Sequence, residues 1–109
     1  MKRRYFGQIG TLKPEMTAEY IRLHASPWPE VVKMIQECNL ENYSIFIQGQ
    51  TVFSYYEYTG DDYEKDMEKM AMDKMTQKWW ENTHPCFLPF SYDSQDEFYH
   101  DMRRIFYLK

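Results

Sequence analysis

The 109-residue chain lacks the features that mark membrane and nucleic-acid-binding proteins. No apolar run is long enough to span a bilayer, and no apolar signal-peptide stretch follows the basic residues Lys2, Arg3 and Arg4. Acidic side chains number 17 against 13 basic ones, and no basic patch stands out. We therefore expect neither a nucleic acid nor a membrane as a partner.

Cysteine is also scarce. Cys38 and Cys86 lie far apart in sequence without metal-type spacing, so we expect no disulfide framework and a cytoplasmic location. No cluster of ligand-type residues predicts a metal site. The length fits a single domain over residues 1–109, and the chain has no repeat, low-complexity tract or linker.

Aromatic side chains, in contrast, are abundant. The chain has ten tyrosines, seven phenylalanines, three tryptophans and eight methionines. Such side chains build cores and dimer interfaces, and several aromatic rings can also line a carbohydrate pocket. Both interpretations hold together, because a small domain with many large apolar residues commonly buries some of them against a partner.

The first half of the chain predicts one strand and two helical segments. Residues 3–12 have the aromatic and aliphatic content of a strand. Thr17 is a reasonable N-cap for a helix that runs to about Ala25. After a proline-rich turn, apolar residues recur at helical spacing to about Asn39, which predicts a second helical segment.

The second half predicts a hairpin, further helix and a last strand. Residues 43–48 and 51–58 alternate, and Gly49–Gln50 fits a two-residue turn with glycine where positive φ is needed. Helical periodicity extends over residues 61–82, and residues 104–108 alternate like a final strand. The order is the split β-α-β pattern, which predicts an α+β, ferredoxin-like βαββαβ fold with helices on one sheet face. A homodimer with its sheets face to face would bury the other face.

The segment from Tyr20 to Glu30 is the most informative part of the chain. Tyr20 and His24 are four residues apart and would project side by side from one helix face. Pro27 disfavours helix before it, and Pro29 suits a first helical position. Groups able to move protons would then lie at a helix end, beside a rigid aromatic turn. Such an arrangement makes a plausible sugar site.

Four motifs follow one another over nearly the whole chain. They are Tyr20-x-x-x-His24-x-x-x-Trp28-Pro29-Glu30, Asn42-Tyr43-Ser44-Ile45-Phe46, Trp79-Trp80 and Ile105-Phe106-Tyr107-Leu108. In this order they resemble the L-rhamnose mutarotase family of small aldose 1-epimerases. The resemblance implies a dimeric α+β barrel that interconverts the α and β anomers of L-rhamnose or a related 6-deoxy sugar, without a metal or organic cofactor.

Carried over residue by residue, the resemblance implies that His24 is the proton donor and that Tyr20, Tyr43, Trp79 and Trp80 bind the sugar. Ring opening needs one proton delivered to the ring oxygen and one removed from the anomeric hydroxyl. Histidine suits this work because its pKa lies near the working pH. We expect Tyr20 or Tyr43 either to orient His24 or to complete the proton path, and the sequence does not decide which of them does so.

Other residues and functions have simpler interpretations. Trp28, between two prolines, is expected to be structural, and His84 and His100 are expected at the surface. The two tryptophans of the third motif point about 100° apart on a helix, so one can be core. The alternative function is a non-catalytic sugar-binding or sensing module on the same dimeric scaffold, whose affinity would survive His24→Asn. A monooxygenase or haem-handling role rests on fold analogy alone.

Overall fold

One antiparallel sheet organises the computed structural model, which describes residues 3–88 and 98–109. Its strands are β1 (Arg4–Leu12), β2 (Leu40–Gln48), β3 (Thr51–Tyr58), β4 (Phe87–Leu88) and β5 (His100–Met102). The order across the sheet is β2-β3-β1-β4, and β5 also pairs with β1. This is the strand order expected of a ferredoxin-like fold, so the predicted fold class is confirmed.

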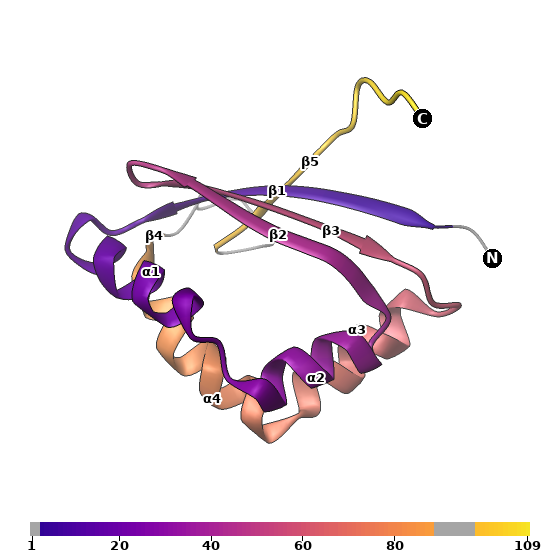
Figure 1. Cartoon of the computed structure of the whole chain (residues 1–109), viewed down its shortest axis with the longest axis horizontal. Coiled ribbons are helices and arrows are strands. Elements are labelled where there is room, and N and C mark those ends of the chain that lie inside the picture. Colours follow the sequence, from indigo (N-terminus) through magenta and orange to yellow (C-terminus); the bar gives the residue numbers. More distant parts are fainter. Residues whose placement is uncertain (1–2, 89–97) are drawn as a thin grey trace.

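The helices all lie on one face of the sheet (Figure 1). They are α1 (Thr17–Ala25), α2 (Pro29–Glu37), α3 (Tyr63–Met72) and α4 (Lys74–Thr83), with short 3-10 turns η1 (Pro14–Met16) and η2 (His84–Cys86). Asp62 and Asp73 cap α3 and α4 by accepting hydrogen bonds from the backbone N–H groups of Lys65 and Thr76. Within the described ranges, no helix is long and apolar enough to cross a membrane.

One helix prediction needs correction, and one alternative is decided. Thr17 is not the N-cap of α1 but its first residue, and its Oγ1 donates to the carbonyl of Lys13 at 3.0 Å. The helical stretch 61–82, which could continue or restart at Lys74, restarts there as a second helix, because Asp73 is extended with ψ of 125° and caps that helix with its side chain.

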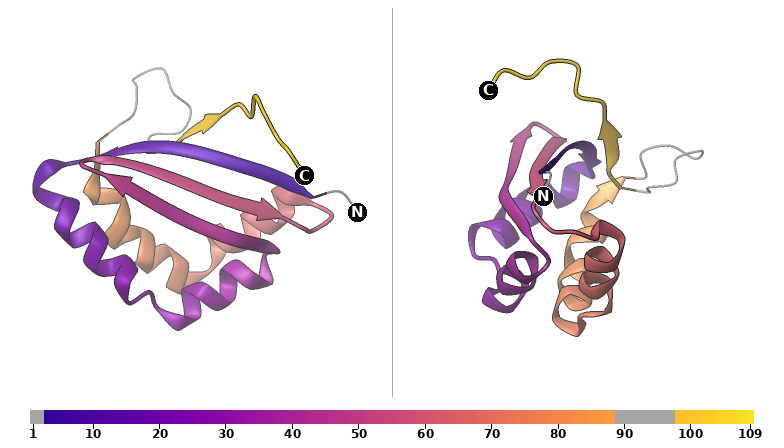
Figure 2. Two further views of the ribbon diagram at one scale, coloured as in Figure 1. Left: turned by 45° about the horizontal axis from the view of Figure 1, so that its top comes forward. Right: turned by 90° about the vertical axis from the view of Figure 1, so that its right-hand side faces the viewer.

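The prediction of a final strand over residues 104–108 is wrong. The last strand is β5, which pairs with Gly7–Ile9 of β1. After Met102 the chain leaves the sheet on the side opposite the helices (Figures 1 and 2). The large apolar side chains of this segment are exposed to solvent. Within the described part of this protomer, no strand pairs with the segment.

The inner face of the sheet carries the core. On β3 the inward residues Val52, Ser54, Tyr56 and Tyr58 are all buried, as strand alternation requires. The remaining core residues come from the helices and strand ends, in three clusters. The two cysteines are free thiols in different clusters.

The outer face of the sheet is apolar and open. Phe46 and Phe53 lie side by side with ring centroids 6.3 Å apart, and Phe46 is 63% exposed. The C-terminal segment, residues 103–109, adds large exposed side chains. Ile105, Phe106 and Leu108 are each at least 77% exposed.

Candidate active site

The five side chains predicted from the sequence line a single cavity of about 70 Å³ between the helices and the sheet. α1 contributes Tyr20 and His24, β2 contributes Tyr43, and α4 contributes Trp79 and Trp80. A cavity of about 280 Å³ shares Tyr43 and both tryptophans in its walls, so the two spaces adjoin. The structure therefore brings all five residues together; their chemical roles stay predictions.

His24 lies in the last turn of α1 with a fixed ring orientation. Its Nδ1 is 2.8 Å from the backbone oxygen of Tyr20. A carbonyl oxygen can only accept, so Nδ1 donates this bond and Nε2 is left as the nitrogen that gains and loses a proton. Burial lowers the pKa of His24, and the bond to the Tyr20 carbonyl opposes this in part.

Aromatic rings hold the His24 imidazole in place. The Tyr20 ring lies against it with a centroid distance of 4.2 Å, as the spacing of four residues predicted. Trp79 meets it edge-on at 5.3 Å, and Trp28 packs against Trp79 at the same distance. Trp28 thus supports the pocket wall from behind, in line with its expected structural role.

Tyr20 presents a buried phenol. The residue is 3% exposed, and its hydroxyl is 2.8 Å from that of Tyr99, with either able to donate. Burial raises the pKa of Tyr20 well above its ordinary value. The group therefore stays protonated near neutral pH and is suited to hydrogen bonding rather than to accepting a proton as a base.

Tyr43 reaches the pocket because of a β-bulge. Glu41 pairs with Glu57, whereas Ser44 already pairs with Tyr55, so β2 carries one extra residue. Asn42, at φ of 51°, takes up the irregularity. Without the bulge, alternation from the buried Leu40 would turn Tyr43 outward. With it, the Tyr43 ring lies 5.3 Å from that of Tyr56 on the inner face.

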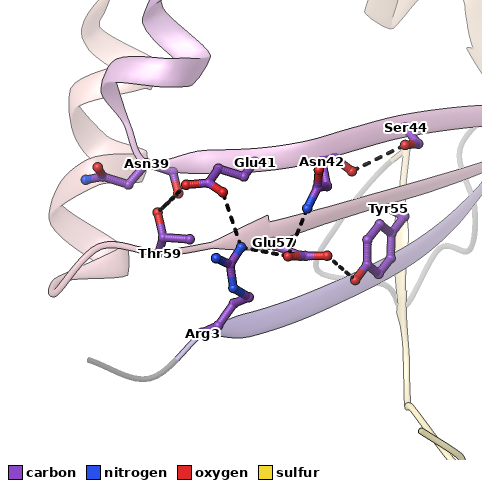
Figure 3. A network of polar contacts seen from close by, with 8 residues as sticks. All are labelled: Arg3, Asn39, Glu41, Asn42, Ser44, Tyr55, Glu57 and Thr59. Atoms are coloured by element: carbon purple, nitrogen blue, oxygen red, sulfur yellow. Dashed lines mark hydrogen bonds and ion pairs between the residues drawn. The ribbon is translucent and has the colours of Figure 1, made fainter. Parts of the chain in front are cut away.

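A polar network on the outer face holds this bulge (Figure 3). The Glu57 carboxylate accepts from Tyr55 at 2.7 Å, from Asn42 at 3.2 Å and from Arg3 at 2.7 Å. The hydrogen bond from Tyr55 is the largest cause of the lowered pKa of Glu57, and Asn42 and Arg3 add to it. Glu57 therefore remains an anion that anchors Asn42 and, through it, the position of Tyr43.

The tryptophan pair lines the pocket with both members. Trp79 is 8% exposed and packs with Leu23 and Val31, yet its edge meets His24. Trp80 stacks on His84 with a centroid distance of 5.5 Å and an interplanar angle of 15°. Trp79 is thus the core member of the pair, as the angle of about 100° allowed, and both rings also line the cavity.

Ile45, Thr83, His84, Phe87 and Tyr99 also line the cavity, and the sequence predicted a site role for none of them. His84 was expected at the surface, but it is half-buried in η2 and lines the cavity. Its spacing of four residues from Trp80 was the available signal. Tyr99 comes from the segment just before β5, which no periodicity marks. His100 is exposed, as expected.

The described part of the chain offers no group of side chains suited to bind a metal ion. Among residues 3–88 and 98–109, no group of three histidine, cysteine, aspartate or glutamate side chains is placed to hold a metal ion. Chemistry without a metal or cofactor stays a prediction from the family resemblance.

Comparison with known proteins identifies the family. The family model described as L-rhamnose mutarotase matches residues 5–108. The chain belongs to the L-rhamnose mutarotase family. The L-rhamnose mutarotase of Oceanobacillus iheyensis is 40% identical over 96 residues, covering 86% of this chain and 88% of its own. That of Bacillus subtilis is 33% identical over 91 residues, covering 76% and 85%. The family and the isomerase class predicted from the four motifs are confirmed.

Solved structures agree on the fold. The L-rhamnose mutarotase of Formosa agariphila has a TM-score of 0.75 at 19% identity, covering 97% of this chain and 99% of its own. A NIPSNAP family protein of Agrobacterium tumefaciens has a TM-score of 0.63 at 15% identity, covering 92% and 83%. At such low identity these likenesses concern the fold alone.

Proposed function

We propose that this protein interconverts the α and β anomers of L-rhamnose, with His24 as proton donor. The observation that carries the proposal is the convergence of Tyr20, His24, Tyr43, Trp79 and Trp80 on one cavity, in a member of the L-rhamnose mutarotase family. These residues come from three elements far apart in sequence, and they combine a titratable imidazole with phenols and flat apolar rings.

His24 supplies the proton for ring opening. Its Nδ1 is held by the Tyr20 carbonyl, so Nε2 is the nitrogen that gives a proton to the ring oxygen as the bond from that oxygen to the anomeric carbon breaks. Burial lowers the pKa of His24 and makes the imidazolium a stronger acid. On closure, the neutral imidazole takes the proton back from the hydroxyl that attacks the carbonyl on its other face.

The other four residues hold the sugar. The phenols of Tyr20 and Tyr43 can donate and accept hydrogen bonds with ring hydroxyls. The faces of Trp79 and Trp80 suit the C–H surface of a pyranose and the C6 methyl group of a deoxy sugar. This division gives His24 the chemistry and leaves the aromatic residues with orientation and desolvation.

The same proposal includes a homodimer formed through the outer face. Phe46, Phe53 and the C-terminal segment leave several large apolar side chains open to solvent on one side of the sheet, which is unusual for a monomer of this size. A second copy suits it, because an antiparallel sheet face can pack on its own image across a two-fold axis. The free thiols of Cys38 and Cys86 agree with a reducing cytoplasm, which stays a prediction.

Saturation-transfer NMR tests the activity and the sugar together. The exchange rate between α and β anomeric protons is measured for L-rhamnose, L-fucose and D-glucose, with and without the protein. We expect faster exchange for L-rhamnose above the other two. Equally faster exchange for L-fucose would widen the proposed substrate range and leave the proposed mechanism unchanged. Binding of L-rhamnose by folded protein without faster exchange would favour the non-catalytic sugar-binding module instead.

A further inference from the structure

The pocket contains a second imidazole besides His24. His84 lines the same 70 Å³ cavity and also the adjoining 280 Å³ cavity. It enters from η2 at the end of α4, whereas His24 enters from α1. The two histidines therefore contribute to the walls of one space from different elements.

Two aromatic rings stack on the His84 imidazole. Its ring stacks on Trp80 at 5.5 Å and on Phe98 at 4.7 Å, with interplanar angles of 15° and 27°. Because these two rings lie nearly parallel to the imidazole and stack on it, we expect its edge, where the two nitrogens lie, to make the contacts with a molecule bound in the cavity. The backbone N–H of His84 donates a hydrogen bond to the Trp80 carbonyl, which fixes the backbone of His84 at the end of α4.

Charged and titratable groups surround His84 on two sides. Toward the pocket lie His24 and the phenols of Tyr20, Tyr43 and Tyr99. On its other side is an open cleft of about 620 Å³ whose wall includes Lys13 and Glu81. His84 thus stands between the pocket and solvent, where its imidazole can equilibrate with bulk protons between turnovers.

The reaction needs two proton transfers, and His24 accounts for one. The phenols of the pocket are poor bases near neutral pH because phenols ordinarily titrate near 10, and burial raises the pKa of Tyr20 further. Among the described residues that line the cavity, only the two histidines ordinarily titrate near neutral pH.

We propose that His84 is the second proton-transfer group of the reaction, taking the proton of the anomeric hydroxyl while His24 serves the ring oxygen. This inference rests on the proposed function. In ring opening, the bond between the ring oxygen and the anomeric carbon breaks, its electron pair stays on that oxygen, and the oxygen takes the proton of His24. The anomeric O–H electrons form the carbonyl double bond as the proton passes to His84.

Closure restores both groups. After rotation about the bond between C1 and C2, the hydroxyl returns its proton to His24 and attacks C1 on the other face. The carbonyl oxygen then takes the proton from His84. No net proton is gained or lost, and one imidazole is protonated while the other is neutral at each stage. The mechanism therefore requires a bell-shaped pH dependence.

The pH–rate profile of anomer exchange tests the inference in the wild type, His84→Gln and the surface control His100→Gln, after subtraction of the buffer rate. We expect a bell-shaped profile for the wild type and the control. The exchange rate of His84→Gln should be about 10²-fold lower at the wild-type optimum. Its rate should no longer decrease at low pH, since no neutral base is then required. A bell of unchanged shape in folded His84→Gln would overturn the inference.

Two further observations keep the test decisive. If the wild type does not accelerate exchange in L-rhamnose, the proposed function fails rather than the role of His84 alone. If His84→Gln does not fold, the imidazole ¹⁵N signals of the wild type are recorded with increasing L-rhamnose. A shift of the His84 signals in parallel with those of His24 supports contact with the sugar. Unchanged His84 signals at saturating L-rhamnose would contradict it.

Discussion

The two faces of the same sheet carry aromatic residues of opposite character. On the inner face, phenols pair with one another: Tyr56 bonds Tyr63 at 2.7 Å and Tyr20 bonds Tyr99 at 2.8 Å, and both Tyr20 and Tyr56 are buried. On the outer face, Phe46 is largely exposed, and the Tyr55 hydroxyl bonds the Glu57 carboxylate at 2.7 Å rather than another phenol. Aromatic content alone therefore does not separate a site from an interface, whereas burial of the polar tips in one cavity does.

The bulge at Asn42 connects the two faces. The network around Glu57 lies outside, yet it decides whether Tyr43 turns inward. A change on the outer face can therefore alter the pocket without touching it. This gives the comparison between the faces measurable consequences.

The largest effect is expected from the inner wall. Trp79→Ala removes a buried ring that contacts both His24 and Trp28, so the free energy of unfolding should fall by about 3–5 kcal/mol. Urea denaturation followed by circular dichroism measures this. Trp79→Phe keeps an aromatic ring and should lose much less. Equal losses in the two variants would show that the wall is not a packed structure.

The outer face should control assembly. Phe46→Glu places a charge in the proposed dimer interface, where burying it without a partner should weaken the dimer by about 10²-fold or more. Sedimentation velocity over a concentration series measures the change. Lys33→Glu, an exposed change on α2, is the control and should leave assembly unaltered. If the wild type is a monomer at all concentrations, the outer face is not a dimer interface.

The connection between the faces can be tested at Asn42. Asn42→Val forces a β-branched residue into φ of 51° and removes the bond to Glu57, which should cost about 1–3 kcal/mol of stability and raise KM for L-rhamnose. Asn42→Gly tolerates the backbone and loses only the side-chain bond, so its effect should be smaller. Denaturation and steady-state exchange kinetics provide both readouts. An unchanged KM in Asn42→Val would show that the orientation of Tyr43 in the pocket does not depend on the bulge.

The smallest effect concerns pH. The folded-state pKa of His24 is lowered from 6.5, so below pH 6.5 the unfolded chain binds a proton that the folded chain does not. The free energy of unfolding should therefore decrease as pH falls from 6.5 through the folded-state pKa, by about 1.4 kcal/mol for each pH unit between the unfolded-state and folded-state pKa. Urea denaturation at pH 7.5 and pH 5 compares the wild type with His24→Gln, which should lose less. If both proteins lose the same free energy of unfolding between pH 7.5 and pH 5, groups other than His24 cause the pH dependence.

Local spacing predicted the parts of the site that depend on a single helix. Tyr20 and His24 are neighbours because residues four apart share a helix face, and the pair Trp79–Trp80 reaches the pocket on α4. Tyr43 was placed by its motif. Its orientation depends on a bulge held by Arg3 and Glu57 from other strands, which no local pattern encodes.

The misplaced features have the same origin in nonlocal contacts. Residues 104–108 alternate like a strand because their side chains need cover, but pairing is decided by which backbone lies beside β1, and that is β5. His84 precedes a proline, which favoured a surface turn, whereas stacking on Trp80 and Phe98 draws it inward. The pairing of β5 with β1 and the stacking of Phe98 on His84 both join residues distant in sequence, whereas the contact with Trp80 is local.

The rate of anomer exchange in L-rhamnose, measured by saturation-transfer NMR for the wild type and His24→Gln at equal concentration, tests the central claim most directly. We predict faster exchange with the wild type and a loss of about 10²–10⁴-fold in the variant, with circular dichroism and assembly unchanged. Exchange at the wild-type rate in folded His24→Gln would contradict the assignment of the inner pocket as the active site.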